Sequence, residues 1–142
     1  MIKKVLCAVD DTEYSKAAVA VASELAKTGD AELTILAVNQ LLGAYGYGGM
    51  STLLWDNATL KRVLDDSAAA AKQAGVKAFK VVDVKSRDIA RAIVVFAEEN
   101  AIDHIVVGTG GKSGVSRLVL GSVSHDVLSR APCTVTVARP RQ

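Results

Sequence analysis

The stretch from Val106 to Val127, VVGTGGKSGVSRLVLGSVSHDV, contains the residue types that bind phosphate, including five of the chain's eleven glycines. It follows an apolar, β-branched run and leads into a helix-like segment. The first N–H groups of a helix have no partner within the helix, and the helix dipole favours an anion beside them. Gly108 and Gly111 would allow a sharp turn and the close approach of a phosphate. The stretch therefore indicates a phosphate-binding turn.

The remaining polar residues of this stretch fit the same chemistry. Lys112 and Arg117 would add charge-assisted hydrogen bonds to phosphate oxygens. Gly121 and Ser122 begin the next helix, where Ser122 is also a favourable N-cap. A plain loop whose glycines only make turns, and whose serine only caps a helix, fits these residues equally well. Both interpretations stay open on physical grounds.

Two familiar phosphate motifs are excluded by spacing. A Walker A loop needs a glycine five positions before the Gly111-Lys112 pair, and Val106 occupies that place. A dinucleotide fingerprint that starts at Gly108 meets Ser113 where its third glycine is required. Any phosphate site here is of another kind.

No residue pattern predicts catalysis or a metal site. Cys7 and Cys133 stand at opposite ends of the chain, and His104 and His125 are isolated, so no ligand cluster is expected. The serines do not fit the G-x-S-x-G elbow of a hydrolase. The two cysteines lie in apolar, strand-like runs and are expected to be buried thiols in a reducing, cytoplasmic protein.

Composition narrows the class of protein further. The chain of 142 residues is long enough for one domain, expected to span residues 1–142, and half of it is apolar. A net charge of +2, with few aromatic residues and no basic cluster, argues against a nucleic-acid partner. The longest apolar runs are too short for a signal peptide or a membrane span.

Hydrophobic periodicity alternates between that of a strand and that of a helix along the whole chain. Strands are expected at 2–9, 32–38, 77–84, 104–107 and 133–138. Helical spacing marks residues 18–26, 60–71, 89–97 and 122–130, with Gly29 and Gly75 as stops. This order predicts an α/β fold: a five-stranded, parallel, doubly wound sheet with helices on both faces.

Ligands of such sheets bind at the carboxyl ends of the strands, beside the point where strand order reverses. The candidate positions are Asp10 to Thr12, Val38 to Gln40, and Gly108 onward. The connection from Asn39 to Asn57 is unusually long and carries the only tryptophan, Trp55. It is either a surface excursion held down by its apolar residues or a lid over a ligand.

A family resemblance bears on the open question. Gly108-x2-Gly111-x9-Gly121-Ser122 resembles the G-x2-G-x9-G-[ST] motif of the ATP-binding branch of the universal stress protein family. VLCAVDDTEYS, AEENAIDHIVVGTGG and GSVSHDVLSRAPCTVTVAR resemble its opening strand, its fourth-strand block and its closing helix and strand. The resemblance covers nearly the whole chain and implies an adenine nucleotide alpha hydrolase-like fold.

The resemblance implies ATP as the ligand, and a divalent cation such as Mg²⁺ that bridges its phosphates is expected on chemical grounds. Asp10 would contact the ribose and adenine end, with Thr12 beside it, and the backbone of Val38 would meet the adenine edge. Gly108 and Gly111 would run along ribose and phosphates, and Gly121 and Ser122 would bind phosphate oxygens, with Lys112 and Arg117 as additional contacts. Asp11 replaces a residue that is often small in the family, which would weaken the binding of a polyphosphate.

The last predicted strand, Cys133 to Ala138, is short and β-branched, and it is expected at an edge of the sheet. Cys133, Val135 and Val137 would share one of its faces. Pairing with a second copy across a two-fold axis would cover the edge, and the resemblance implies a homodimer of this kind.

Together these features predict a cytoplasmic, nucleotide-dependent regulatory protein of the stress response. One alternative is a family member that has lost nucleotide binding and acts only through protein contacts. The other is an ATP-hydrolysing enzyme, which is expected to be slow because no general base is evident.

Overall fold

The computed structural model describes residues 1–43, 50–110 and 120–141. In chain order the elements are β1 (Lys4–Val9), α1 (Tyr14–Gly29), β2 (Glu32–Leu42), β3 (Thr52–Leu53), α2 (Asn57–Gln73), β4 (Phe79–Ser86), α3 (Ile89–Glu99), β5 (His104–Gly108), α4 (Ser122–Arg130) and β6 (Thr134–Ala138). The predicted alternation of strands and helices is confirmed, with β3 as an addition.

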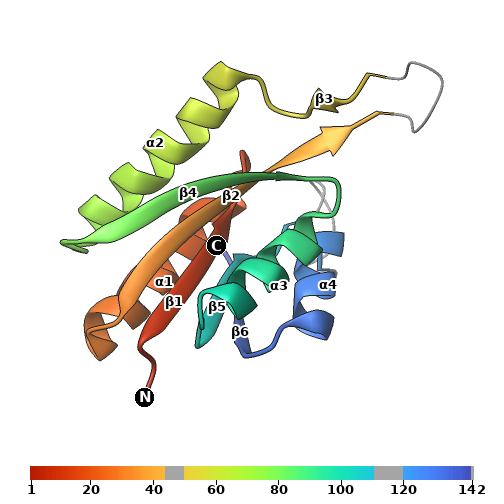
Figure 1. Cartoon of the computed structure of the whole chain (residues 1–142). Helices are drawn as coiled ribbons and strands as arrows, with labels where there is room; N and C mark the ends of the chain where they lie inside the picture. Colours follow the sequence, from red (N-terminus) through yellow and green to blue (C-terminus); the bar gives the residue numbers. More distant parts are fainter. Residues whose placement is uncertain (44–49, 111–119, 142) are drawn as a thin grey trace.

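The parallel strands form one sheet in the order β4–β2–β1–β5–β6. From the central β1 the chain builds outward through β2 and β4, and it then returns to the other side of β1 for β5 and β6 (Figure 1). Strand order therefore reverses at β1, and the predicted doubly wound parallel sheet is confirmed. The carboxyl ends of these strands meet at one edge, where such folds bind ligands.

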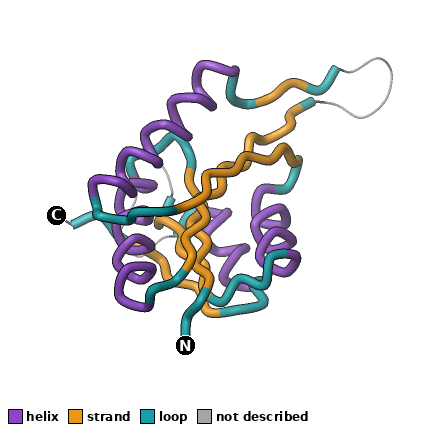
Figure 2. The backbone as a smooth tube through the Cα atoms, turned by 60° about the vertical axis from the view of Figure 1, so that its left-hand side comes forward, coloured by secondary structure: helices purple, strands orange, loops and turns teal. Residues whose placement is uncertain are grey.

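Helices cover both faces of the sheet (Figure 2). α1 and α2 pack on one face and α3 and α4 on the other, and each pair encloses its own apolar cluster. β1 is buried on both sides, because Val5, Cys7 and Val9 face α1 and α2 while Leu6 faces α3. A strand buried on both faces must be apolar along its length, which explains the VLCAV run of the sequence.

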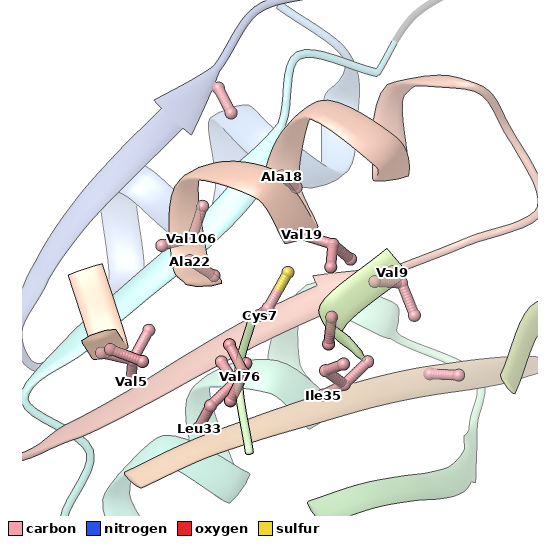
Figure 3. Close-up of a cluster of buried hydrophobic side chains, with 14 of the residues drawn as sticks. Val5, Cys7, Val9, Ala18, Val19, Ala22, Leu33, Ile35, Val76 and Val106 are labelled. Atoms are coloured by element: carbon pink, nitrogen blue, oxygen red, sulfur yellow. The ribbon is translucent and has the colours of Figure 1, made fainter. Parts of the chain in front are cut away.

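The Cys7 side chain lies in the first of these clusters, with its sulfur pointing toward Val19 and Ala22 of α1 (Figure 3). Burial raises the pKa of the Cys7 thiol to about 12. A thiol with such a pKa stays protonated and is a poor nucleophile, so Cys7 is a packing residue, as its sequence context predicts.

Two helix ends differ from the prediction. α1 includes Gly29, and the left-handed residue that ends it is Asp30 (φ 50°), because aspartate tolerates this conformation better than most residues. α4 has Gly121, not Ser122, as its N-cap. The N–H of Gly121 donates to the Thr109 carbonyl at 2.8 Å, which holds residue 121 outside the helix and moves Ser122 to the first helical position.

The long connection after the second strand is partly regular. β2 continues past its predicted end at Val38 to Leu42, and β3 returns antiparallel to it with Leu41 opposite Leu53. The buried Asn39 side chain donates to the Trp55 carbonyl at 3.0 Å and accepts from the Trp55 N–H at 2.9 Å. These two bonds hold Trp55 beside β2 and keep the described part of the connection, a hairpin, against the sheet.

β6 is an edge strand, since within the described ranges it pairs with β5 alone. Cys133, Val135 and Val137 pack toward α3 and α4, and Ala138 belongs to the opposite cluster, so the predicted division of faces is confirmed. Charged, exposed Lys80, Asp83 and Lys85 protect the other edge strand, β4. No helix in the described part of the chain is both long and apolar enough to span a bilayer.

A buried histidine predicts the pH dependence of stability. His104 Nε2 lies 2.6 Å from Thr136 Oγ1, and burial lowers the pKa of His104 below its ordinary value. The unfolded chain then binds more protons below about pH 6.5, so the free energy of unfolding should fall as pH is lowered from about 7.5 to about 5.5. Urea denaturation at the two pH values measures this loss.

The variant His104→Gln keeps a polar partner for Thr136 but cannot take up a proton, so the decline should be smaller in it. His125→Gln, at the exposed second histidine, is the matched control and should keep the wild-type decline. An unchanged pH dependence in His104→Gln would contradict the prediction.

Candidate functional site

A cavity of about 220 Å³ opens at the carboxyl edge of the sheet, where strand order reverses. The ends of β1 and β5 and the middle of β2 form its floor, Leu54 and Trp55 of the hairpin line one side, and the first turn of α4 lines another. Ile89 and Ile93 of α3 complete the apolar wall. The cavity thus lies where the sequence predicts a ligand site.

Asp10 directly follows β1 and is held by its neighbours in sequence. Its Oδ1 accepts from the Thr12 N–H at 2.9 Å, from Thr12 Oγ1 at 2.6 Å and from Ser15 Oγ at 2.9 Å. The Asp10 N–H donates to Ser15 Oγ at 2.7 Å. No donor in the described ranges contacts the other carboxylate oxygen, Oδ2, which remains able to accept a hydrogen bond from a ligand hydroxyl or amine.

Thr12 lies outside the cavity and supports Asp10 from there. It does not line this cavity, but it borders a hollow of about 760 Å³ between α1 and α2 that shares Asp10, Asp11 and Ser15 with it. The two hydrogen bonds that Thr12 donates to Asp10 orient the carboxylate. Thr12 therefore positions Asp10.

Val38 lies at the point where β2 extends past β1. The last pair between the two strands joins Val9 to Ala37, so Val38 is the first residue of β2 beyond the end of β1. It lines the cavity together with Leu36. Val38 thus lines the cavity at the place where β2 is no longer paired with β1.

Gly108 ends β5 and meets α1 closely. A Cβ at this position would lie 2.8 Å from the Tyr14 carbonyl oxygen, so only glycine allows the first turn of α1 to approach β5. The Gly108 carbonyl also accepts from Ser124 Oγ at 2.6 Å. These contacts give Gly108 a packing role that the sequence spacing does not reveal.

Gly110 continues the turn in a left-handed conformation, with φ of +61°. A side chain there would be strained, although its Cβ would have space beside Ser124 and Gly121. The hydrogen bond from Gly121 to Thr109 closes this turn and brings the end of β5 to the start of α4. Segments that the sequence separates by a long glycine-rich stretch therefore meet at the cavity.

The first turn of α4 offers free backbone donors. The helical hydrogen bonds of α4 begin with the His125 N–H, which donates to the carbonyl of the N-cap residue Gly121 at 3.0 Å. Among the described residues, no group accepts from the amides of Ser122, Val123 or Ser124. With the helix dipole they form a site for an anion.

Charge in the described lining is negative. Asp10 and Asp11 are its only ionisable acids, and no lysine, arginine or histidine of the described ranges joins them. Gly111, Lys112 and Arg117, which the sequence predicts as phosphate contacts, lie outside the described residues. Of the other predicted site residues, the structure brings Asp10, Val38, Gly108, Gly121 and Ser122 together around one cavity.

Sequence reasoning missed several residues of the cavity wall: Tyr14, Leu54, Ile89, Ile93 and Ser124. Ile89 and Ile93 are indistinguishable by pattern from other core residues of a helix. The positions of Leu54 and Trp55 could have been inferred from the sequence, since large apolar residues in a long connection need a surface to pack on. Asn39 falls within the candidate stretch Val38 to Gln40, but no sequence pattern indicates that its side chain binds the backbone of Trp55.

The geometry defines a class: doubly wound α/β proteins with a ligand cavity at the carboxyl edge of a parallel sheet. Comparison with known proteins is more specific, because residues 1–139 match the model of the universal stress protein family. The chain belongs to the universal stress protein family.

Individual relatives cover almost the whole chain. It is 30% identical to universal stress protein YxiE of Bacillus subtilis, over 98% of this chain and 100% of the relative. It is 32% identical to universal stress protein MJ0531 of Methanocaldococcus jannaschii, over 98% of this chain and 83% of the relative. A solved structure of a universal stress protein in complex with cAMP superposes with a TM-score of 0.73 at 25% identity, over 96% of each chain.

The packing of Gly108 generates a prediction for stability. Gly108→Ala places a methyl group 2.8 Å from the Tyr14 carbonyl oxygen, so α1 or β5 must shift. Overpacking of this kind costs about 1–3 kcal/mol of unfolding free energy. Gly29→Ala is the matched control, because its added Cβ would lie 3.4 Å from the nearest atom. Urea denaturation of both variants measures the difference, and equal stabilities would contradict the close approach.

Proposed function

We propose that this chain binds an adenine nucleotide, with ATP as the expected ligand, in the cavity at the carboxyl edge of its sheet. Binding then regulates contacts with other proteins in the stress response. The observation that carries the proposal is the division of the cavity into an apolar side at β2 and a side of free amides at α4, with a carboxylate between them.

The spacing of the strands suits this ligand. β1 separates β2 from β5, and neighbouring strands lie about 4.8 Å apart, so the two sides of the cavity are about 10 Å apart. A base against β2 would then leave its ribose beside Asp10 and its phosphates at the first turn of α4. The structure of a relative in complex with cAMP supports an adenine nucleotide as the ligand.

Each predicted residue then has a role. The backbone of Val38 meets the adenine edge, and Asp10 accepts from ribose hydroxyls through its free Oδ2. Gly108 lies beside the ribose. Gly121, whose N–H is bonded to Thr109, leaves room for the phosphates because it has no side chain, and the amide and hydroxyl of Ser122 meet the phosphate oxygens. Gly111, Lys112 and Arg117 keep their predicted phosphate contacts as part of the proposal.

A magnesium ion would be held chiefly by the phosphates. The described residues include no group of three or more histidine, cysteine, aspartate or glutamate side chains placed to hold a metal. Mg²⁺ commonly binds through substrate phosphates, water and one or two carboxylates, and Asp10 and Asp11 are the carboxylates near the cavity. The negative charge of Asp11 would also oppose a polyphosphate that lacks the cation.

Regulation, and not catalysis, is the proposed outcome of binding. Asp10, one of the two carboxylates that line the cavity, already accepts three hydrogen bonds at Oδ1 and is positioned as a hydrogen-bond acceptor, and no general base is evident in the sequence. Hydrolysis of ATP should therefore be slow at most. Both cysteines are free thiols, which fits the reducing cytoplasm as the place of action.

Gly121→Val tests the site. Residue 121 has φ −65° and ψ 159°, a conformation that valine adopts readily, so the fold should survive. The new side chain would occupy the space of the phosphates, and the affinity for ATP should fall more than about tenfold, as measured by calorimetry with magnesium. Ser129→Val, farther along α4, is the control and should bind as wild type does.

The outcomes separate the alternatives. Wild-type protein that gives no binding heat would favour a module acting through protein contacts alone. Multiple turnovers near about one per second, the low end for ordinary enzymes, would favour an ATP-hydrolysing enzyme. A folded Gly121→Val variant with wild-type affinity would show that the phosphate site is misplaced.

We also propose that two copies pair through residues 133–138, β6 and its preceding cysteine. Wild-type protein should then sediment at twice the chain mass of 14.8 kDa. Thr134 is exposed at the start of this edge, so Thr134→Asp should weaken the dimer by placing a charge where the strands pair. Lys80→Asp on the opposite edge strand is the control, and dissociation of both variants, or of neither, would contradict the proposed interface.

A further inference from the structure

Leu54 is a large apolar side chain that stays half exposed at the mouth of the cavity. The residue is 51% exposed, although it directly precedes the buried Trp55. The other large hydrophobic residues that are exposed in the described ranges, Met1, Leu42, Met50 and Leu128, do not line the cavity. Ligand binding that covers an apolar surface at a cavity mouth is favourable, because it removes that surface from water.

Hydrogen bonds on both sides of Leu54 hold it in place. Its own N–H donates to the Gln40 carbonyl at 2.8 Å. The next residue, Trp55, is bound through both its N–H and its carbonyl by the side chain of Asn39, which is 1% exposed. We call these two bonds the Asn39–Trp55 clasp. The exposure of Leu54 is therefore a fixed feature of the wall.

A second anchor acts on the same hairpin from the loop between β4 and α3. Arg87 donates from Nη1 to the Gly43 carbonyl at 3.2 Å and from Nη2 to Ser51 Oγ at 2.7 Å. Gln40 Nε2 in turn donates to the Arg87 carbonyl at 3.3 Å. Both strands of the hairpin are thus tied to the loop that leads into α3, whose Ile89 and Ile93 line the cavity.

The position of Leu54 decides which part of a ligand it meets. The clasp and the bond to Gln40 place it next to residues 39 and 40 of β2, on the β2 side of the cavity, whereas the free amides of α4 lie beyond β1. A leucine side chain has no hydrogen-bonding group, so it contacts the apolar face of a flat ring and not the polar edge of a base.

We propose that Leu54, fixed by the Asn39–Trp55 clasp, covers the face of the nucleotide's base and is a determinant of affinity for the base-bearing half of the ligand. The inference rests on the proposed nucleotide site and adds a residue outside the glycine-rich motif. Phosphate binding at α4 is independent of this contact.

The experiment compares ligands with and without a base. Calorimetry with ATP and magnesium measures the whole ligand, and NMR titration with ribose 5-phosphate measures the half without a base. Leu54→Ala should weaken ATP binding about five- to tenfold, since about half of a leucine side chain is available to be covered. It should leave the ribose 5-phosphate affinity unchanged.

Leu42→Ala is the matched control. It removes the same atoms from a leucine of the same hairpin that is 38% exposed and does not line the cavity. Wild-type affinity for both ligands is expected. If Leu54→Ala binds ATP as wild type does, or loses affinity for both ligands equally, the proposed role of Leu54 is wrong. If wild-type protein binds neither ligand, the nucleotide site itself is wrong.

The clasp has a separate readout in Trp55, the only tryptophan of the chain. Trp55 is 6% exposed, and its indole N–H has no partner among the described residues, so its emission reports on local packing. Asn39→Ala should shift this emission toward that of a solvated indole and weaken ATP binding as Leu54→Ala does. Because both changes remove one contact, the double variant should bind no worse than Leu54→Ala. Additive losses would overturn a positioning role for Asn39.

Discussion

The central constraint on this protein is the need to satisfy backbone polar groups where the parallel strands end. β1 stops at Val9 while β2 continues to Leu42, so the ladder between them ends and a hollow opens. Side chains and turns take over most of the freed groups: Ser15 for Asp10, Ser124 for Gly108, and Asn39 for Trp55. Among the described residues, the Asp10 Oδ2 and the amides of Ser122, Val123 and Ser124 have no such partner, and a ligand can bind to them.

The glycines at the end of β5 and the start of α4 have different structural roles. Gly108 is required because the backbone of Tyr14 occupies the space of its missing side chain, and Gly110 because of its positive φ. Gly121 is extended, so its lack of a side chain matters for the space in front of α4. The described glycines of this segment therefore combine packing of the scaffold with access to the cavity.

The hairpin adds a wall to a site whose other parts come from the sheet edge. Two anchors, Asn39 and Arg87, hold it in place, and the exposed Leu54 directly precedes the buried Trp55. In its described part the connection is thus held against the sheet by polar bonds and by the buried Trp55, and its Leu54 and Trp55 line the cavity.

The sequence alone was sufficient to predict the alternation of strands and helices and the parallel sheet. It also predicted the edge at which Asp10, Val38 and Gly108 meet. These features follow from hydrophobic periodicity and from the handedness of crossovers, which act within short stretches of chain. Only the tertiary structure decided the continuation of β2 to Leu42, the Asn39–Trp55 clasp, the contact of Gly108 with Tyr14 and the cap at Gly121. Each of these depends on groups that are distant in sequence and become neighbours only after the sheet has formed, so no local propensity records them.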